Sequence, residues 1–274
     1  MRDATSGTAL SHLDSGWWGE FQLDMGQTYH LAMGGFQLAI TRLLHEWQIR
    51  HVRQEEQADS GQWQSEINFS LPGRDWALER ISLNRSGGGL RLWPVLADKP
   101  VVIRPYHPLW LPAGESATIF VSSILSVQVQ IDSPRAPFTR DIPVQLASET
   151  WMGPNTMDGE LCYAEMTSAR MTVESLPTRA FRAITPLLIL NRGREPLNLE
   201  RVSLPIPMLD LYANADGTLW TSAVTYTRAD EAASAKIEIG AAAPNQVPGA
   251  LKLTPARQKP DKGVLVKAID RLFG

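Results

Sequence analysis

Residues 117–131 read ATIFVSSILSVQVQI, and apolar and polar side chains alternate through this stretch with little interruption. Its odd positions are Ala117, Ile119, Val121, Ser123, Leu125, Val127, Val129 and Ile131, whereas its even positions are mostly Thr, Ser and Gln. A period of two is typical of a β-strand that packs one face on a core and turns the other toward water. Because the same rhythm recurs along most of the chain, the sequence predicts an all-β protein.

Turn signals between the alternating segments favour antiparallel pairing. The run SGGG at 86–89 separates two apolar segments, and ANADG at 213–217 separates MLDLY from TLWTSAVTY. Short Gly- and Asp-Gly-containing connections of this kind are typical of β-hairpins. We therefore expect an antiparallel β-sandwich architecture.

A boundary between two sandwich-like units is expected at residues 132–143, DSPRAPFTRDIP, which hold three prolines and four charged residues. The predicted organisation is a flexible N-terminus at 1–15, a first unit at 16–132 and a second unit at 144–240. One extended sandwich is the alternative.

Composition limits the classes of function. The chain has 274 residues, 43% of them hydrophobic and 20% charged, and a formal net charge of −3. This charge balance gives no field that favours nucleic acid, so no nucleic-acid partner is expected. Cys162 is the single cysteine, which excludes an intramolecular disulfide and suits a reducing compartment. No apolar segment is long enough for a signal peptide core or a membrane span, and we expect a cytoplasmic protein.

The C-terminal region differs in composition from the rest. Residues 241–262 are rich in Ala and Pro and predict a semi-extended linker. Residues 263–274 read GVLVKAIDRLFG. They carry an apolar stripe at helical spacing and predict a short amphipathic helix. The residues expected to bind a partner are Val264, Leu265, Lys267, Ile269, Arg271, Leu272 and Phe273. The occupant of this face is either the protein's own sandwich, a protein partner such as a membrane channel, or a membrane surface.

The segment SETWMGPNTMDGELCY at 148–163 combines carboxylates with aromatic rings around a Pro/Gly loop. Its candidate ligand-binding residues are Glu149, Trp151, Asp158, Glu160 and Tyr163. Carboxylates beside rings serve sugar binding and glycoside hydrolysis, and several oxygen donors in a loop suit calcium. Solvated acids in a turn-rich connection explain the same pattern.

Motifs for catalysis are missing from the sequence. The chain has neither a GxSxG elbow nor an HExxH pair, and its five histidines do not show metal-ligand spacing. Gly87–Gly89 lack the Lys-Ser/Thr that follows a phosphate-binding loop. Cys162 has no basic neighbour in the sequence, and we expect it to be a buried, inert thiol. We therefore expect a non-enzymatic protein without metal or cofactor.

The order of several segments resembles an uncharacterised microbial family, domain of unknown function 432. The segments are a Gly-x-Phe opening strand, KPVVIRPYHPLWLPAGE at 99–115, SETWMGPNTMDGELCYAE at 148–165 and LDLYANADGTLWT at 209–221. The resemblance covers about residues 16–244 and carries no catalytic assignment. Members of that family are sometimes encoded beside small-conductance mechanosensitive channels, which implies a partner of that kind.

Two functions follow as hypotheses. The first is a cytoplasmic accessory or regulatory protein that acts by protein–protein binding. The second is a carbohydrate-binding or carbohydrate-active protein that uses the 149–163 loop and exposed tryptophans. Nine tryptophans occur, seven of them within the first 110 residues, and core packing is the expected role of most.

Overall fold

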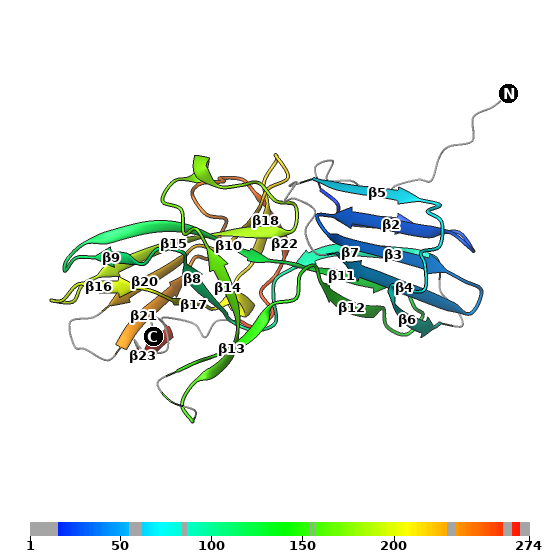
Figure 1. Cartoon of the computed structure of the whole chain (residues 1–274). Coiled ribbons are helices and arrows are strands. Elements are labelled where there is room, and N and C mark those ends of the chain that lie inside the picture. The colour runs from blue at the N-terminus through cyan, green and yellow to red at the C-terminus, as the bar shows by residue number, and fades with distance from the viewer. Residues whose placement is uncertain are drawn as a thin grey trace. The chain divides into compact units, whose positions relative to one another are not determined.

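The computed structural model describes residues 16–54, 62–83, 87–153, 155, 157–228, 234–259 and 265–268, without the side chains of 234 and 265–268. The chain forms two compact units (Figure 1). Unit 1 contains Met1–Val95, Ser126–Gln145 and Thr178–Phe181, and unit 2 contains Leu96–Leu125, Leu146–Pro177 and Arg182–Gly274. Each unit is therefore assembled from separate stretches of the sequence.

The units differ from the two successive halves that the sequence predicted. The expected boundary at 132–143 lies inside unit 1, where β12 (Phe138–Pro143) pairs with β11 (Ser126–Ile131). Prolines and charges are tolerated there because β12 is the edge strand of its sheet.

Unit 1 is built from two sheets. The first has the strand order β1-β7-β11-β12 and the second has the order β5-β2-β3-β4-β6. Their remaining strands are β1 (Gly19–Gln22), β2 (Thr28–Met33), β3 (Phe36–Arg42), β4 (Glu46–Arg53), β5 (Trp63–Ile67), β6 (Ala77–Ser82) and β7 (Gly89–Val95). β7 and β11 of the first sheet alternate buried apolar and partly exposed residues, as expected for a sheet with one face on a core, whereas β2 and β3 of the second sheet are buried over four consecutive residues each. Arg140 on β12 and Glu79 on β6 join the two layers at one margin, with a nitrogen–oxygen distance of 3.0 Å.

Unit 2 is also made of sheets. The largest sheet has the order β22-β18-β19-β15-β20-β21-β23, and β10 also pairs with β15. A second sheet has the order β13-β14-β8-β17, and β16 and β9 form a two-stranded ribbon. The strands of the largest sheet are β10 (Ser116–Ile124), β15 (Arg182–Asn191), β18 (Leu211–Ala213), β19 (Leu219–Thr221), β20 (Val224–Arg228), β21 (Ser234–Ile239), β22 (Leu251–Thr254) and β23 (Leu265–Ala268). The others are β8 (Val101–Pro105), β9 (Leu109–Leu111), β13 (Ser148–Met152), β14 (Glu160–Thr167), β16 (Leu197–Leu199) and β17 (Val202–Leu204).

Most pairings between the described strands are antiparallel, as predicted, but β14 runs parallel to β8 and β15 runs parallel to β19 and β20. Two 3₁₀ turns, Val173–Ser175 and Ile206–Met208, are short connections in unit 2. The described residues contain no helix whose length and hydrophobicity would suit a membrane crossing.

The alternating stretch 117–131 serves both units. It breaks at Leu125 into β10, which pairs with β15 in unit 2, and β11, which lies between β7 and β12 in unit 1. Every odd position from 117 to 131 is buried, including Leu125 itself. The predicted inward face is therefore confirmed, and its parity is kept across the passage from one unit to the other.

The predicted linker at 241–262 is wrong as far as residue 259, because this segment packs on unit 2. Val247 is buried in an apolar cluster with Phe120, Ile184 and Trp220. β22 pairs with β18, and the Asp210 carboxylate accepts hydrogen bonds from Lys252 Nζ at 2.6 Å and from the Ala256 amide at 2.8 Å. The Ala/Pro-rich segment passes through bends and turns at 241–249 before it forms β22.

The predicted C-terminal helix is also wrong where the structure describes it. β23 pairs antiparallel with β21, from Ile237 opposite Leu265 to Ser234 opposite Ala268. A twelve-residue helix is marginal in water, whereas pairing with an open strand edge satisfies the backbone groups of the segment. The side chains of Leu265 and Lys267 are not described, and the other predicted binding residues, Val264, Ile269, Arg271, Leu272 and Phe273, lie outside the described residues.

Candidate functional site

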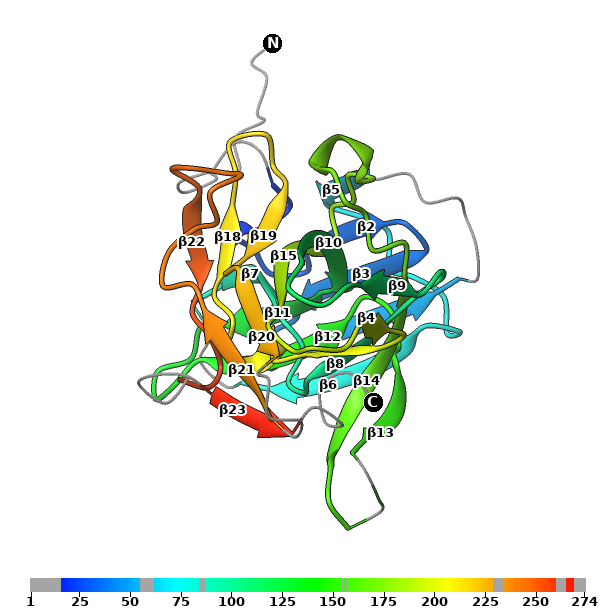
Figure 2. The same cartoon turned by 90° about the vertical axis from the view of Figure 1, so that its left-hand side faces the viewer.

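The candidate site lies on the β13–β14 hairpin of unit 2, which contains the carboxylate and aromatic residues of 148–163. In both views the hairpin extends beyond the rest of its sheet (Figures 1 and 2). β8 pairs with β14 only from Tyr163 onward, so residues 160–162 of β14 are paired by β13 alone. The end of the hairpin is therefore a two-stranded ribbon.

One face of this ribbon is packed. Met152 and Cys162 are fully buried and form an apolar cluster with Val102 on β8. The prediction that Cys162 is buried is confirmed. Because an isolated hairpin is marginally stable, this contact with the sheet is what holds the ribbon in position.

The opposite face exposes apolar side chains. Trp151 and Leu161 lie directly opposite each other on the two strands, and each is 43% exposed. Met157 in the connecting turn is 93% exposed. The Trp151 indole N–H donates a hydrogen bond of 2.8 Å to the Asn155 carbonyl, which orients the ring along the turn. We call Trp151, Met157 and Leu161 the hairpin patch.

A set of polar groups borders the hairpin patch on the same face. Glu149 lies opposite Tyr163, and its carboxylate forms an ion pair with Lys99. The Lys99 ammonium is 4.8 Å from the centroid of the Tyr163 ring, and the Tyr163 hydroxyl donates a hydrogen bond of 3.0 Å to Asp98. We call Asp98, Lys99, Glu149 and Tyr163 the polar rim.

Two members of the polar rim, Lys99 and Tyr163, have raised pKa values. The hydrogen bond with Glu149 raises the pKa of Lys99 above its ordinary value, and partial burial, together with the bond to Asp98, raises the pKa of Tyr163. Both groups are therefore protonated at neutral pH, where neither is a base or a nucleophile. The arrangement orients side chains without activating them.

The structure separates the residues that the sequence grouped as one ligand site. Glu149, Trp151 and Tyr163 share the exposed face, whereas Glu160 lies opposite Met152 on the other face of the ribbon. Asp158 is exposed in the turn. Glycoside hydrolysis needs two carboxyl groups that flank one bond, and Glu149 and Glu160 point away from each other across the ribbon.

Metal binding finds little support in the geometry. Within the described parts of the chain, no three His, Cys, Asp or Glu side chains gather closely enough to hold an ion. The Glu149 carboxylate is also engaged by Lys99, which would compete with a cation for it.

Sequence reasoning missed four members of the site, Asp98, Lys99, Met157 and Leu161. Asp98 and Lys99 precede β8, about fifty residues before Glu149, and no local pattern links them to the hairpin. Leu161 shares its parity with Tyr163, so the alternation of β14 could have placed it on the same face.

The tryptophans divide between core and surface. Trp17, Trp18, Trp47 and Trp220 are buried, which confirms core packing for these four. Trp110 on β9 and Trp151 are exposed. The expectation of core packing therefore does not extend to Trp110 and Trp151.

Comparison with protein families gives one match. The model of the family described as protein of unknown function (DUF432) matches residues 17–273. The chain belongs to this family. The match continues past residue 244, where the resemblance in the sequence ended, and therefore includes the segment that packs on unit 2 as β22 and β23. Neither the curated proteins nor the solved structures contain a match to the chain.

Proposed function

We propose that this protein is a non-enzymatic, cytoplasmic accessory or regulatory protein that acts by binding another protein through the hairpin patch. The observation that carries the proposal is the opposed, exposed pair of Trp151 and Leu161 on a ribbon whose other face is packed. Folding of unit 2 buries only part of these two side chains, so their remaining exposed apolar area is available for binding a partner.

The chemistry of the surface fits protein recognition. Exposed apolar area bordered by polar groups is typical of interaction sites. Tryptophan is enriched among the residues that dominate binding energy, and surrounding polar groups exclude water from such a centre. The Lys99–Glu149 pair and the Tyr163–Asp98 hydrogen bond fix the border before a partner arrives, which lowers the entropy cost of binding.

The partner that we propose is a small-conductance mechanosensitive channel, the class that the family resemblance implies. A membrane channel presents protein surface next to the bilayer, and the hairpin extends beyond the rest of its sheet, where its exposed face is open to a contact (Figure 2). The carbohydrate hypothesis at these residues has less support, because Glu160 faces away from Glu149 and Trp151.

The experiment compares two leucine variants of the full chain. Leu161→Asp alters the hairpin patch, and Leu251→Asp, at a leucine 55% exposed on β22, is its matched control. Binding to a purified small-conductance mechanosensitive channel in nanodiscs is measured by biolayer interferometry, with empty anionic nanodiscs alongside. We expect Leu161→Asp to weaken binding at least tenfold and Leu251→Asp to change it less than twofold.

Three results would contradict the proposal. Equal losses in the two variants would mean that the hairpin patch is not the contact. Equal binding to empty nanodiscs would assign the affinity to the lipid surface. No binding to the channel by the wild type would overturn the choice of partner.

A further inference from the structure

The outer face of the β1-β7-β11-β12 sheet in unit 1 has an unusual set of side chains. The inner side chains of β7 and β11, among them Leu92 and Val129, are fully buried. Alternation therefore turns the intervening residues to the opposite face. On the four strands of this sheet, the residues turned to that face include Glu20, Arg91, Trp93, Gln128, Gln130 and Asp141. The side chains of this set are two amides, two carboxylates, one guanidinium and one large aromatic ring. The set contains no lysine.

Hydrogen bonds across the strands hold the first row of this face. Glu20, Arg91 and Gln130 lie side by side on β1, β7 and β11. Arg91 donates from Nε to Glu20 at 3.0 Å, and from Nη1 to Asp132 at 2.9 Å and to Gln130 at 3.5 Å. One guanidinium thus fixes two carboxylates and an amide.

The next row repeats the arrangement with an aromatic ring. Trp93, Gln128 and Asp141 lie side by side on β7, β11 and β12. Gln128 Nε2 donates a hydrogen bond of 2.9 Å to the Asp141 carboxylate. All three side chains are partly exposed, so the ring and the amide–acid pair both meet solvent.

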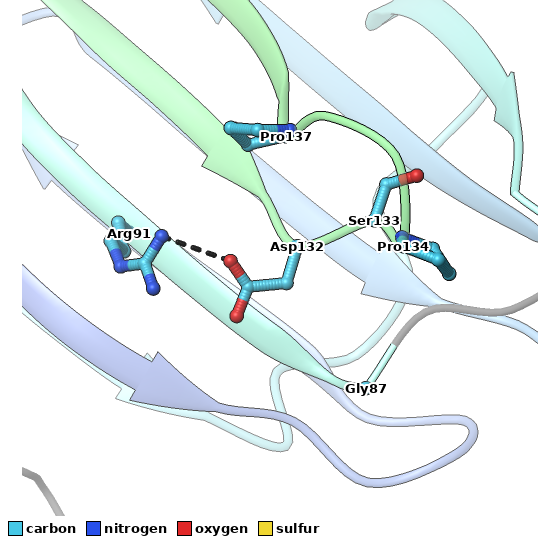
Figure 3. A pocket seen from close by; sticks show the side chains of 6 residues that line it. All are labelled: Gly87, Arg91, Asp132, Ser133, Pro134 and Pro137. Carbon is cyan, nitrogen blue, oxygen red and sulfur yellow. Dashed lines mark hydrogen bonds and ion pairs between the residues drawn. The ribbon is translucent and has the colours of Figure 1, made fainter.

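A pocket of about 420 Å³ opens at one end of this face (Figure 3). It is lined by Gly87, Arg91, Asp132, Ser133, Pro134 and Pro137. The Arg91–Asp132 ion pair spans it, and the two prolines stiffen the loop that forms its wall. Arg91 in the lining and Trp93 are two residues apart on β7, which is roughly 7 Å along the strand.

These groups suit a neutral polyhydroxylated ligand. A sugar hydroxyl both donates and accepts, and it needs donors and acceptors side by side, which amides, carboxylates and a guanidinium supply together. The flat ring of Trp93 offers an apolar surface for a sugar ring. Anions are disfavoured, because Glu20, Asp132 and Asp141 outnumber Arg91. A cation would need acceptors alone, and two of the carboxylates are already paired with Arg91.

We propose that this face binds a neutral oligosaccharide, with one end in the Arg91–Asp132 pocket and a sugar ring on Trp93. The site lies in unit 1 and is independent of the hairpin patch in unit 2.

The test uses the full chain, fluorescently labelled, on a microarray of neutral and acidic glycans, with oligolysine spots as the cationic probe. The variants are Trp93→Ala and Gln130→Ala, and the control is Gln64→Ala, an exposed glutamine on β5 of the same unit. Thermal melts identify any variant that fails to fold, and Gln130→Ala tests the site should Trp93→Ala unfold.

We expect the wild type to bind neutral glycans. The binding to these glycans should fall more than tenfold in Trp93→Ala, at least fivefold in Gln130→Ala and less than twofold in Gln64→Ala. Retention of no glycan, retention of oligolysine alone, or equal losses in Gln130→Ala and Gln64→Ala would overturn the proposal.

Discussion

β11 and the end of the β13–β14 hairpin carry the same kind of alternation, yet their apolar side chains have opposite fates. On β11, Val127, Val129 and Ile131 are fully buried, because a second sheet of unit 1 covers them. On the hairpin, Trp151 and Leu161 remain nearly half exposed. The pattern in the sequence specifies a strand with two faces, and only the neighbouring elements decide whether the apolar face is core or surface.

The difference has a structural cause. β11 lies between β7 and β12 in the middle of its sheet, whereas the hairpin extends past the end of β8. A central strand is covered on its apolar face by the opposite layer, but a protruding ribbon needs only one face for its attachment. The hairpin uses Met152 and Cys162 for that purpose, and its other face stays exposed.

The largest effect is expected in β11. Val129→Asp places an unpaired carboxylate in the core of unit 1 and should lower the free energy of unfolding by about 5 kcal/mol. Thr118→Asp, at an exposed position of the same alternating stretch, should cost less than about 1 kcal/mol. Urea denaturation measures both, and similar midpoints would show that the two faces are not distinguished.

A buried ion pair gives the next effect and tests the core of unit 2. Glu165 accepts hydrogen bonds from Arg182 at 2.8 Å and from the Ile124 amide at 3.0 Å, and both partners of the pair are largely buried. Arg182→Met should cost about 3–5 kcal/mol at pH 7, since it leaves a buried carboxylate without its partner.

The loss should depend on pH. Burial raises the pKa of Glu165, and Arg182 opposes this rise, so the pKa is higher still in Arg182→Met. A raised pKa in the folded state means that the folded protein binds the proton more tightly than the unfolded chain does. Stability therefore falls as the pH rises from the carboxyl pKa of the unfolded chain through the raised pKa of the folded protein. The deficit of the variant should therefore shrink as the pH is lowered from 7 toward 5. A deficit that stays constant or grows would contradict this assignment.

A smaller effect is expected in the segment that the sequence predicted as a linker. Asp210→Ala removes the acceptor of Lys252 and of the Ala256 amide and should cost about 1–2 kcal/mol. Glu238→Ala, on β21 with its carboxylate paired to Lys236 on the same strand, should cost less than about 0.5 kcal/mol. Thermal melts compare the two variants. An unchanged melting temperature for Asp210→Ala would mean that the segment behaves as the linker that the sequence predicted.

The smallest effect on stability is expected in the hairpin patch. Leu161→Asp should change the free energy of unfolding by less than about 0.5 kcal/mol, because the side chain already meets water. Cys162, on the packed face of the same strand, should react slowly with a thiol reagent in both wild type and variant. A large loss of stability would show that the exposed face belongs to the core, and rapid labelling would show that the face with Cys162 is not packed.

The sequence predicted the strands well because alternation is a local property. Every inward position of 117–131 was assigned correctly, but the break at Leu125 was not, since its side chain is apolar and in phase with both strands. The division into units depends on which distant strands pair, and this information is not contained in any one segment.

The tail shows the opposite limitation. The apolar spacing of residues 263–274 fits a helix. Residues 265–268 nevertheless pair with β21 as a strand, because the edge of β21 offers backbone hydrogen bonds. At the candidate site the residue types were recognised, but the face on which Glu160 lies depends on the register of β13 and β14. Lys99 comes from the bend before β8, far from the hairpin in the sequence.

Photo-crosslinking in living cells tests whether the hairpin patch binds a partner. A benzoylphenylalanine residue replaces Leu161 in one variant and Leu251 in the other, and the crosslinked products are identified by mass spectrometry. We expect position 161 to crosslink to a small-conductance mechanosensitive channel and position 251 not to do so. Equal crosslinking to the channel from both positions, or none from position 161, would contradict this expectation.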